Sequence, residues 1–171
     1  MNTSNIEYRR KLEDNIEKFV YTWGICLERH IRARFGEEGV KALRRMARDY
    51  KLRVIEDEIS PPYYDNALSE KQRTLIFLDE LLQGSLKGKV KYCEPAEYPF
   101  IATIATFKNR VLPVAVILDG EEDILIPLIK KVQGDEPLFV IYQNSVLQNR
   151  CQKLWGNVKR FESCYEEVTT A

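Results

Sequence analysis

The chain has 171 residues, 44% of them hydrophobic, and 26 basic and 26 acidic side chains give it a formal net charge of zero. A chain of this length can bury one good core, and a neutral chain has no global attraction to nucleic acid or to a membrane surface. No apolar run approaches the ~20 residues of a membrane helix, and the polar start lacks the apolar segment of a secretory signal. We therefore expect a soluble, cytoplasmic protein that does not enter a membrane.

The first third of the chain has helical periodicity. Apolar residues recur every three or four positions from Ser4 to Phe35, which predicts one long amphipathic helix, weakened in its middle by Gly24. Gly36 ends this helix, and Glu37 begins a second one. The joint is so short that we expect the two helices to form an antiparallel hairpin.

The second helix carries a basic stripe, formed by Lys41, Arg44, Arg45, Arg48 and Lys51. Such a stripe could hold the phosphates of nucleic acid or of a nucleotide, because each cation replaces counterions of the phosphate. The alternative, which we favour, is a solvated helix face that is balanced by the acidic residues 56–58.

A loop rich in proline and tyrosine, residues 60–66, is the best boundary between a helical N-terminal region, 1–60, and an α+β domain, 61–171. One continuous domain over residues 1–171 is the alternative. Tyr63 and Tyr64 either form an adhesive surface or pack beneath this loop. A capping-box pattern at Ser69 then starts a third helix that stops near Gly84.

The C-terminal half reads mainly as strands. Two apolar runs, 100–107 and 111–118, have the spacing of a tight hairpin, and Pro113 requires an edge or a bulge because it lacks an amide donor. The spacing of apolar residues favours a helix over 121–133. Pro127 argues against it, because proline breaks a hydrogen bond in a helix interior. The alternative is a second hairpin through Asp119 and Gly120.

A buried strand over 138–142, a helix capped by Asn144 or Ser145, and a return strand over 158–161 complete the pattern. Together these elements predict an α+β fold. An N-terminal helical hairpin and a third helix pack on a mostly antiparallel mixed sheet, with the order β-β-α-β-α-β in the C-terminal half.

The residues that could carry chemistry form no recognised motif. The single histidine, His30, excludes catalysis by paired histidines, and we expect it at the surface or in an interface. The four cysteines, Cys26, Cys93, Cys151 and Cys164, lack the spacing of a zinc site or a disulfide framework. The acidic residues 119–123 suit a helix start better than a magnesium site. We therefore predict no catalytic residue, no metal and no cofactor, and lean against an enzyme.

Residues 98–162 bear one resemblance to a known family. The strand 138–142, Asn144, the helix ending in Leu154-Trp155-Gly156 and the return strand resemble the last third of the GNAT acyltransferase fold. The resemblance implies acyl-CoA binding near Asn144 and Trp155. Two departures matter: the turn that holds the CoA pyrophosphate has no counterpart, and tryptophan stands where the family often has a tyrosine acid. It thus implies a degenerate acyltransferase or a sensor of acyl-CoA or nucleotide.

Our leading interpretation is a non-enzymatic binding protein. Its N-terminal helices would contact a protein partner or a second copy of the chain, with Trp23, Leu27 and Ile31 on the surface and the two tyrosines, Tyr63 and Tyr64, beside them. The GNAT-like enzyme or sensor is the first alternative. Nucleic-acid binding by the basic stripe is the second.

Overall fold

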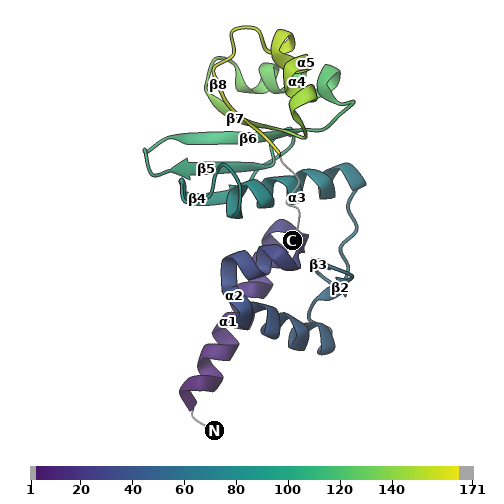
Figure 1. Ribbon diagram of the computed structural model, residues 1–171, viewed down its shortest axis with the longest axis vertical. Helices are drawn as coiled ribbons and strands as arrows, with labels where there is room; N and C mark the ends of the chain where they lie inside the picture. The colour runs from purple at the N-terminus through teal and green to yellow at the C-terminus, as the bar shows by residue number, and fades with distance from the viewer. Residues whose placement is uncertain (1–2, 166–171) are drawn as a thin grey trace. The chain divides into compact units, whose positions relative to one another are not determined.

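The computed structural model describes residues 3–165, and of these the side chains from residue 5 onward. The chain forms two compact units, residues 1–78 and 79–171, which we call unit 1 and unit 2. Along the chain, the division between the two units falls inside helix α3 (Leu68–Leu82), later than the boundary expected after residue 60. The α+β class predicted from the sequence is confirmed (Figure 1).

Unit 1 contains two long helices, α1 (Thr3–Trp23) and α2 (Glu28–Arg48), which pack on each other. A small antiparallel sheet accompanies them, with β3 (Glu58–Ser60) between β1 (Cys26–Leu27) and β2 (Arg53–Ile55). The single helix predicted over Ser4–Phe35 is therefore wrong, because the chain leaves the helix after Trp23 and pairs through β1 before α2 begins.

The break depends on Gly24. Its φ angle of +75° lies in the left-handed region that glycine alone adopts at little cost. A Cβ atom there would stand 2.5 Å from Cε2 of Tyr64, so the tyrosine ring packs directly on the glycine. Gly36, with φ of 69° and ψ of −169°, makes a second break inside α2, which separates the two helical segments as expected.

His30 is buried, whereas we expected it at the surface or in an interface. It is the third residue of α2, and its Nδ1 accepts a 3.1 Å hydrogen bond from the backbone N–H of Leu27. This is the contact that Glu or Gln makes in a capping box. The histidine therefore fixes the start of α2.

Unit 2 is built on a five-stranded mixed sheet. Its strands lie in chain order: β4 (Val90–Pro95), β5 (Ala102–Thr106), β6 (Val111–Ile117), β7 (Leu138–Tyr142) and β8 (Arg160–Cys164). Strands β4, β5 and β6 form an antiparallel meander, whereas β6, β7 and β8 are parallel. Helix α4 (Glu122–Gln133) connects β6 to β7, and α5 (Ser145–Trp155) connects β7 to β8. The favoured helix over 121–133 is thus confirmed, and the rival hairpin is wrong.

The backbone around Pro113 and Pro127 accommodates the missing amide hydrogen of each. The carbonyl of Val114 accepts from the N–H of Ile101, so the backbone of Val114 faces β5 and that of Pro113 faces the other side. Pairing between β6 and β7 begins only at Val114, and no ladder bond is lost at Pro113. Pro127 lies in the second turn of α4, where the helix continues without that one amide.

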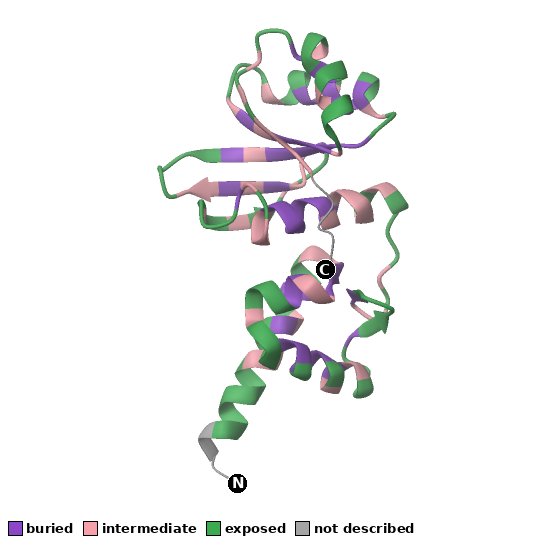
Figure 2. Cartoon of the chain, in the orientation of Figure 1, coloured by how far each residue is buried: buried purple, intermediate pink, exposed green. Residues whose placement is uncertain are grey.

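One core of unit 2 lies between the sheet and its two crossover helices. It joins residues of β6 and β7 to residues of α4 and α5: Ala115, Ile117, Leu125, Ile126, Ile129, Leu138, Val140, Tyr142, Leu147, Cys151 and Trp155. Figure 2 shows β6 and β7 mostly buried, and α4 and α5 with buried positions among exposed ones. Helices α4 and α5 therefore cover the same face of the parallel half of the sheet.

The opposite face of the sheet is also buried, at Ile104, Val114 and Val116 among others. The end of α3 belongs to this unit, and the hydroxyl of Tyr165, just after β8, donates a 2.9 Å hydrogen bond to the buried Asp79 of that helix. This bond ties the end of α3 to the segment that follows β8.

Candidate functional site

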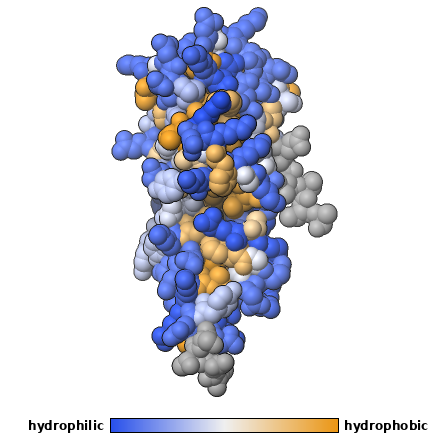
Figure 3. Space-filling view, turned by 90° about the vertical axis from the view of Figure 1, so that its left-hand side faces the viewer, coloured by the Kyte–Doolittle hydropathy of each residue, from blue (hydrophilic) through white to orange (hydrophobic). Residues whose placement is uncertain are grey.

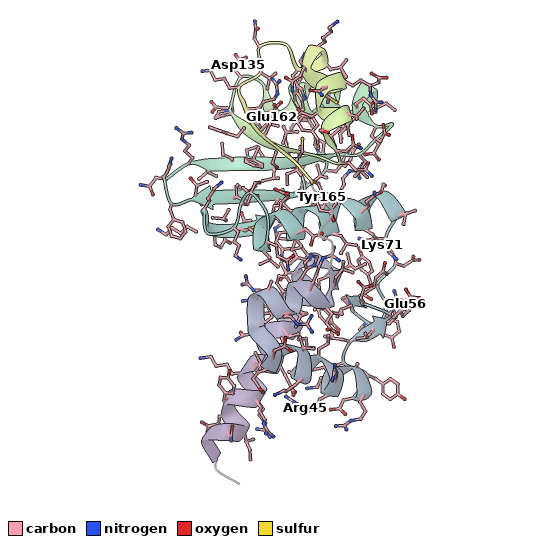
Figure 4. All side chains as sticks on the ribbon, viewed as in Figure 1. Arg45, Glu56, Lys71, Asp135, Glu162 and Tyr165 are labelled. Atoms are coloured by element: carbon pink, nitrogen blue, oxygen red, sulfur yellow. The ribbon has the colours of Figure 1, made fainter. Side chains whose placement is uncertain are left out.

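The basic stripe of α2 is largely neutralised within unit 1. Lys41 pairs with Glu38 at 2.7 Å, and both Arg45 and Lys51 reach Glu13 of α1, at 3.1 and 3.6 Å. A fourth member, Arg48, lies 3.8 Å from the neighbouring Asp49. Arg44 is exposed and has no ion-pair partner among the residues that the structure describes. Figure 4 labels Arg45 at this surface. The arrangement matches a balanced helix face better than a phosphate site.

The two residues singled out for acyl-CoA binding are not brought together. Asn144 caps the start of α5, where its Oδ1 accepts a 2.8 Å hydrogen bond from the N–H of Leu147. Trp155 ends the same helix and is completely buried in the core. Asn144 and Trp155 lie at opposite ends of α5, about 16 Å apart at the usual helical rise. Each has a structural role, and the GNAT resemblance itself remains a prediction.

Two of the three helical residues expected on an interaction surface are core residues. Leu27 is 7% exposed and Ile31 is fully buried, so neither can contact a partner, and that part of the prediction is wrong. Both belong to the segment where β1 turns into α2, which the sequence presented as one continuous helix. Trp23 is partly exposed and stacks at 5.2 Å on Phe77.

The two loop tyrosines have separate roles. Tyr63 is 98% exposed, whereas Tyr64 packs on Gly24 and lies beneath the ammonium group of Lys71, 5.7 Å from its ring centre. Of the predicted surface, Tyr63 and parts of Trp23 and Tyr64 are thus accessible.

The acidic residues before α4 form a compact cluster with one arginine. Arg150 of α5 bridges Asp119 and the buried Glu122. The second oxygen of Glu122 accepts a 2.8 Å hydrogen bond from the N–H of Gly120. Within residues 3–165 no group of three or more potential metal ligands is close enough to hold an ion. The cluster ties α5 to the start of α4.

Two cysteines are held in the thiol form by their surroundings. Burial raises the pKa of Cys26 to about 12, and burial together with the charge of Glu122 raises that of Cys151 to about 11. Because the thiolate is the reactive species, neither is an activated nucleophile. Cys93 and Cys164 are partly exposed.

A polar network between β7, β8 and α5 went unnoticed in the sequence. Its centre is Glu162 of β8, which lies between the sheet and α5 (Figure 4). The hydroxyl of Tyr142 donates to it at 2.7 Å, and the amide groups of Gln148 and Gln152 donate at 3.2 and 3.3 Å. Arg160, two residues before Glu162, adds an ion pair.

The network fixes the protonation of its members. Burial, and then the hydrogen bond to Glu162, raises the pKa of Tyr142, so the phenol stays protonated. Burial alone would raise the pKa of Glu162, but the hydrogen bonds from Tyr142, Arg160 and Gln152 outweigh it and lower that pKa. Four side chains already donate to this carboxylate, so it has little capacity left for a ligand. The network is a structural tie of the edge strand.

The first half of α1 is an exposed helical segment of unit 1. Residues 5–11 are all exposed, with Ile6 at 40% and Tyr8 at 60% of their full accessibility. From Leu12 onward the helix enters the core, and Ile16 is completely buried. About two turns of α1 therefore extend beyond the contacts that hold the rest of the helix.

Comparison with protein-family models, with curated proteins and with solved structures gave no match to this chain. None of the described helices combines the length and the apolar character that crossing a bilayer requires.

Proposed function

We propose that the chain is a binding protein that uses the first half of α1 to contact a protein partner or a second copy of itself. The observation that carries this proposal is the exposure of Tyr8, together with Ile6 on another side of the helix, at the start of a helix that is buried along one side farther on, at Ile16. Tyr8 lies four residues before Leu12, and Leu12 four before Ile16, so neighbouring positions on one side of the helix run from the surface into the core.

Energetic reasons support a partner at this position. A helical segment without tertiary contacts relies on intrinsic propensity, and such segments are marginal in water. Covering the exposed parts of Ile6 and Tyr8, 40% and 60% of their full accessibility, would contribute about 1.5–3 kcal/mol of association free energy before entropic costs. That is enough to matter for a modest interface but not to make one alone.

The test is sedimentation velocity and native mass spectrometry of the full chain at micromolar concentration, comparing wild type with the double variant Ile6→Ser, Tyr8→Ser. We expect the wild type to be a dimer, a larger assembly or a complex with a retained protein. The double variant should weaken that association at least tenfold.

The matched control is Tyr63→Ser, which removes a tyrosine that is 98% exposed but lies on a loop outside α1. It should leave association unchanged. A wild-type protein that stays monomeric and retains no partner, or an assembly that is insensitive to the α1 variant, would overturn the proposal.

A further inference from the structure

Unit 2 has a second cluster of basic residues, which pairing of β4 with β5 assembles from two segments of the chain. The five residues are all exposed: Lys87, Lys89, Lys91, Lys108 and Arg110. Val90 pairs with Thr106, and the N–H of Phe107 donates to the carbonyl of Lys89, so the start of β4 lies beside the β5–β6 turn. We call this region the turn end of the sheet.

The charges at the turn end are not balanced. Within residues 3–165 none of the five cations has an ion-pair partner, in contrast to the basic stripe of α2, where four of five do. The guanidinium of Arg110 lies 5.1 Å from the ring centre of Phe161, which holds it by a cation–π contact that leaves its charge in place. Figure 3 faces the turn end and shows mostly hydrophilic side chains with hydrophobic ones between them.

An uncovered stretch of sheet adjoins these cations. Tyr92 of β4 pairs with Ala105 of β5, which pairs with Val111 of β6, so the three form a row on one face. This is the face that α4 and α5 cover farther along the sheet, at Ala115 and Ile117. Here it is open, since Tyr92 is 59% and Val111 68% exposed. The small Ala105 leaves room beside the tyrosine ring, and Phe107 in the adjacent turn is 64% exposed.

We propose that the turn end of the sheet binds single-stranded nucleic acid. Proteins that hold single strands combine a cluster of cations, which contact the phosphates, with exposed aromatic rings, on which bases stack. Both elements are present at this end of the sheet, where Arg110 lies over Phe161 on the face opposite to Tyr92, and the hydroxyl of Tyr92 donates a 2.8 Å hydrogen bond to Glu94. A duplex would not use the aromatic rings, because its bases are already paired and stacked. This proposal is independent of the binding function assigned to α1.

The test is fluorescence anisotropy of the full chain with labelled mixed-sequence oligonucleotides of about twelve nucleotides, as single-stranded DNA, single-stranded RNA and duplex DNA. We expect saturable binding of the single strands and weaker binding of the duplex. If all five cations contact phosphates, the logarithm of the binding constant should fall with the logarithm of salt with a slope of about −3.5. The double variant Lys91→Glu, Lys108→Glu should bind at least tenfold more weakly and with a shallower slope.

Variants of the aromatic residue separate stacking from charge. Tyr92→Ala should weaken binding about fivefold or more, whereas Tyr92→Phe keeps the ring and should bind like wild type. Phe107→Ala provides a second test in the turn. The charge control is Arg44→Glu, Arg48→Glu on α2, which changes as many charges away from the turn end and should leave affinity unchanged. Circular dichroism establishes that each variant is folded.

Three results would overturn the proposal. The first is no saturable binding of any oligonucleotide. The second is binding that the α2 control weakens as much as the turn-end variants do. The third is binding of an acidic polypeptide or of anionic vesicles without binding of single strands, which would assign the surface to another class of partner.

Discussion

The hydroxyl of Tyr142 donates a 2.7 Å hydrogen bond to Oε1 of Glu162, and this bond joins an interior strand of the sheet to its edge. Val140 is the backbone partner of Glu162, so the phenol reaches across the two strands to a residue one pleat away. The edge strand β8 therefore has a side-chain tie to β7 in addition to its backbone ladder.

Replacing Tyr142 by phenylalanine should destabilise unit 2 by about 1–3 kcal/mol, because a partly buried carboxylate loses one of its donors while the ring keeps its packing. The free energy of unfolding from urea titrations measures this loss. Tyr63→Phe, which alters a fully exposed phenol, should change it by less than about 0.5 kcal/mol. An equal effect of both substitutions would show that the hydrogen bond contributes nothing.

The same network predicts a pH dependence. The pKa of Glu162 is lower in the folded chain than in the unfolded chain, so the folded state binds fewer protons. Its contribution to stability is complete above the unfolded value of about 4.3 and is lost as the pH falls through the lower folded value. Urea midpoints should therefore fall more steeply in acid for wild type than for Glu162→Gln. Parallel curves for the two proteins would contradict the assignment.

The cysteines should divide into two classes of reactivity. Cys26 and Cys151, whose pKa values are raised to about 12 and about 11, should resist a maleimide in the native protein at neutral pH. The partly exposed Cys93 and Cys164 should react first. Peptide mapping by mass spectrometry identifies the labelled sites, and labelling after denaturation in urea, where all four should react, is the control. Early labelling of Cys26 would show that unit 1 opens there.

Substitution of Gly24 by alanine should destabilise unit 1 in two ways. A left-handed backbone costs alanine about 1–2 kcal/mol, and the ring of Tyr64 must also move to admit the new Cβ. Gly120→Ala is the comparison, because Gly120 has a φ angle of +87° but a Cβ added there would have no neighbour within 4 Å. Thermal unfolding should show a larger loss of stability for Gly24→Ala than for Gly120→Ala. Equal losses would mean that the ring of Tyr64 moves aside at no cost.

Local patterns predicted most elements of unit 2. The i, i+4 spacing of apolar residues in 121–133 decided correctly for a helix, because a stripe of that period can face a sheet only as a helix. Pro113 was expected at an edge or a bulge, but it lies in the interior strand β6, just before the pairing with β7 begins. The parallel pairing of β6, β7 and β8 was less visible, since strand partners depend on the path of the crossovers rather than on the strands themselves.

The break at Gly24 illustrates where periodicity fails. The apolar spacing continues through Leu27 and Ile31 because both are buried, although the first lies in a strand and the second in a new helix. A strand of two residues is too short to show the alternation of apolar and polar residues by which strands are recognised. The histidine that caps α2 was misplaced for the same reason, since a residue inside a continuous helix has no cap to make.

The contacts that define the candidate sites are tertiary, and this limited their prediction. The basic stripe of α2 is evident in the sequence, but its acidic partner Glu13 lies on α1, more than thirty residues away. One weak signal for Glu162 was present in the sequence: it is an acidic residue that shares one face of a strand with Arg160 and Cys164. Its donors become recognisable only once the register of β7 and β8 is known.

The mixed sheet also has a consequence for how unit 2 forms. Residues 107–110 alone join β5 to β6, whereas the whole of α4 must be placed before β6 can pair with β7, and the whole of α5 before β7 can pair with β8. Closing a long loop costs more chain entropy than closing a short one, and distant contacts slow folding. We expect the antiparallel meander to be the early scaffold on which the parallel strands are laid. The strand that carries Glu162 would then be added last during folding and would be the first to detach in partial unfolding.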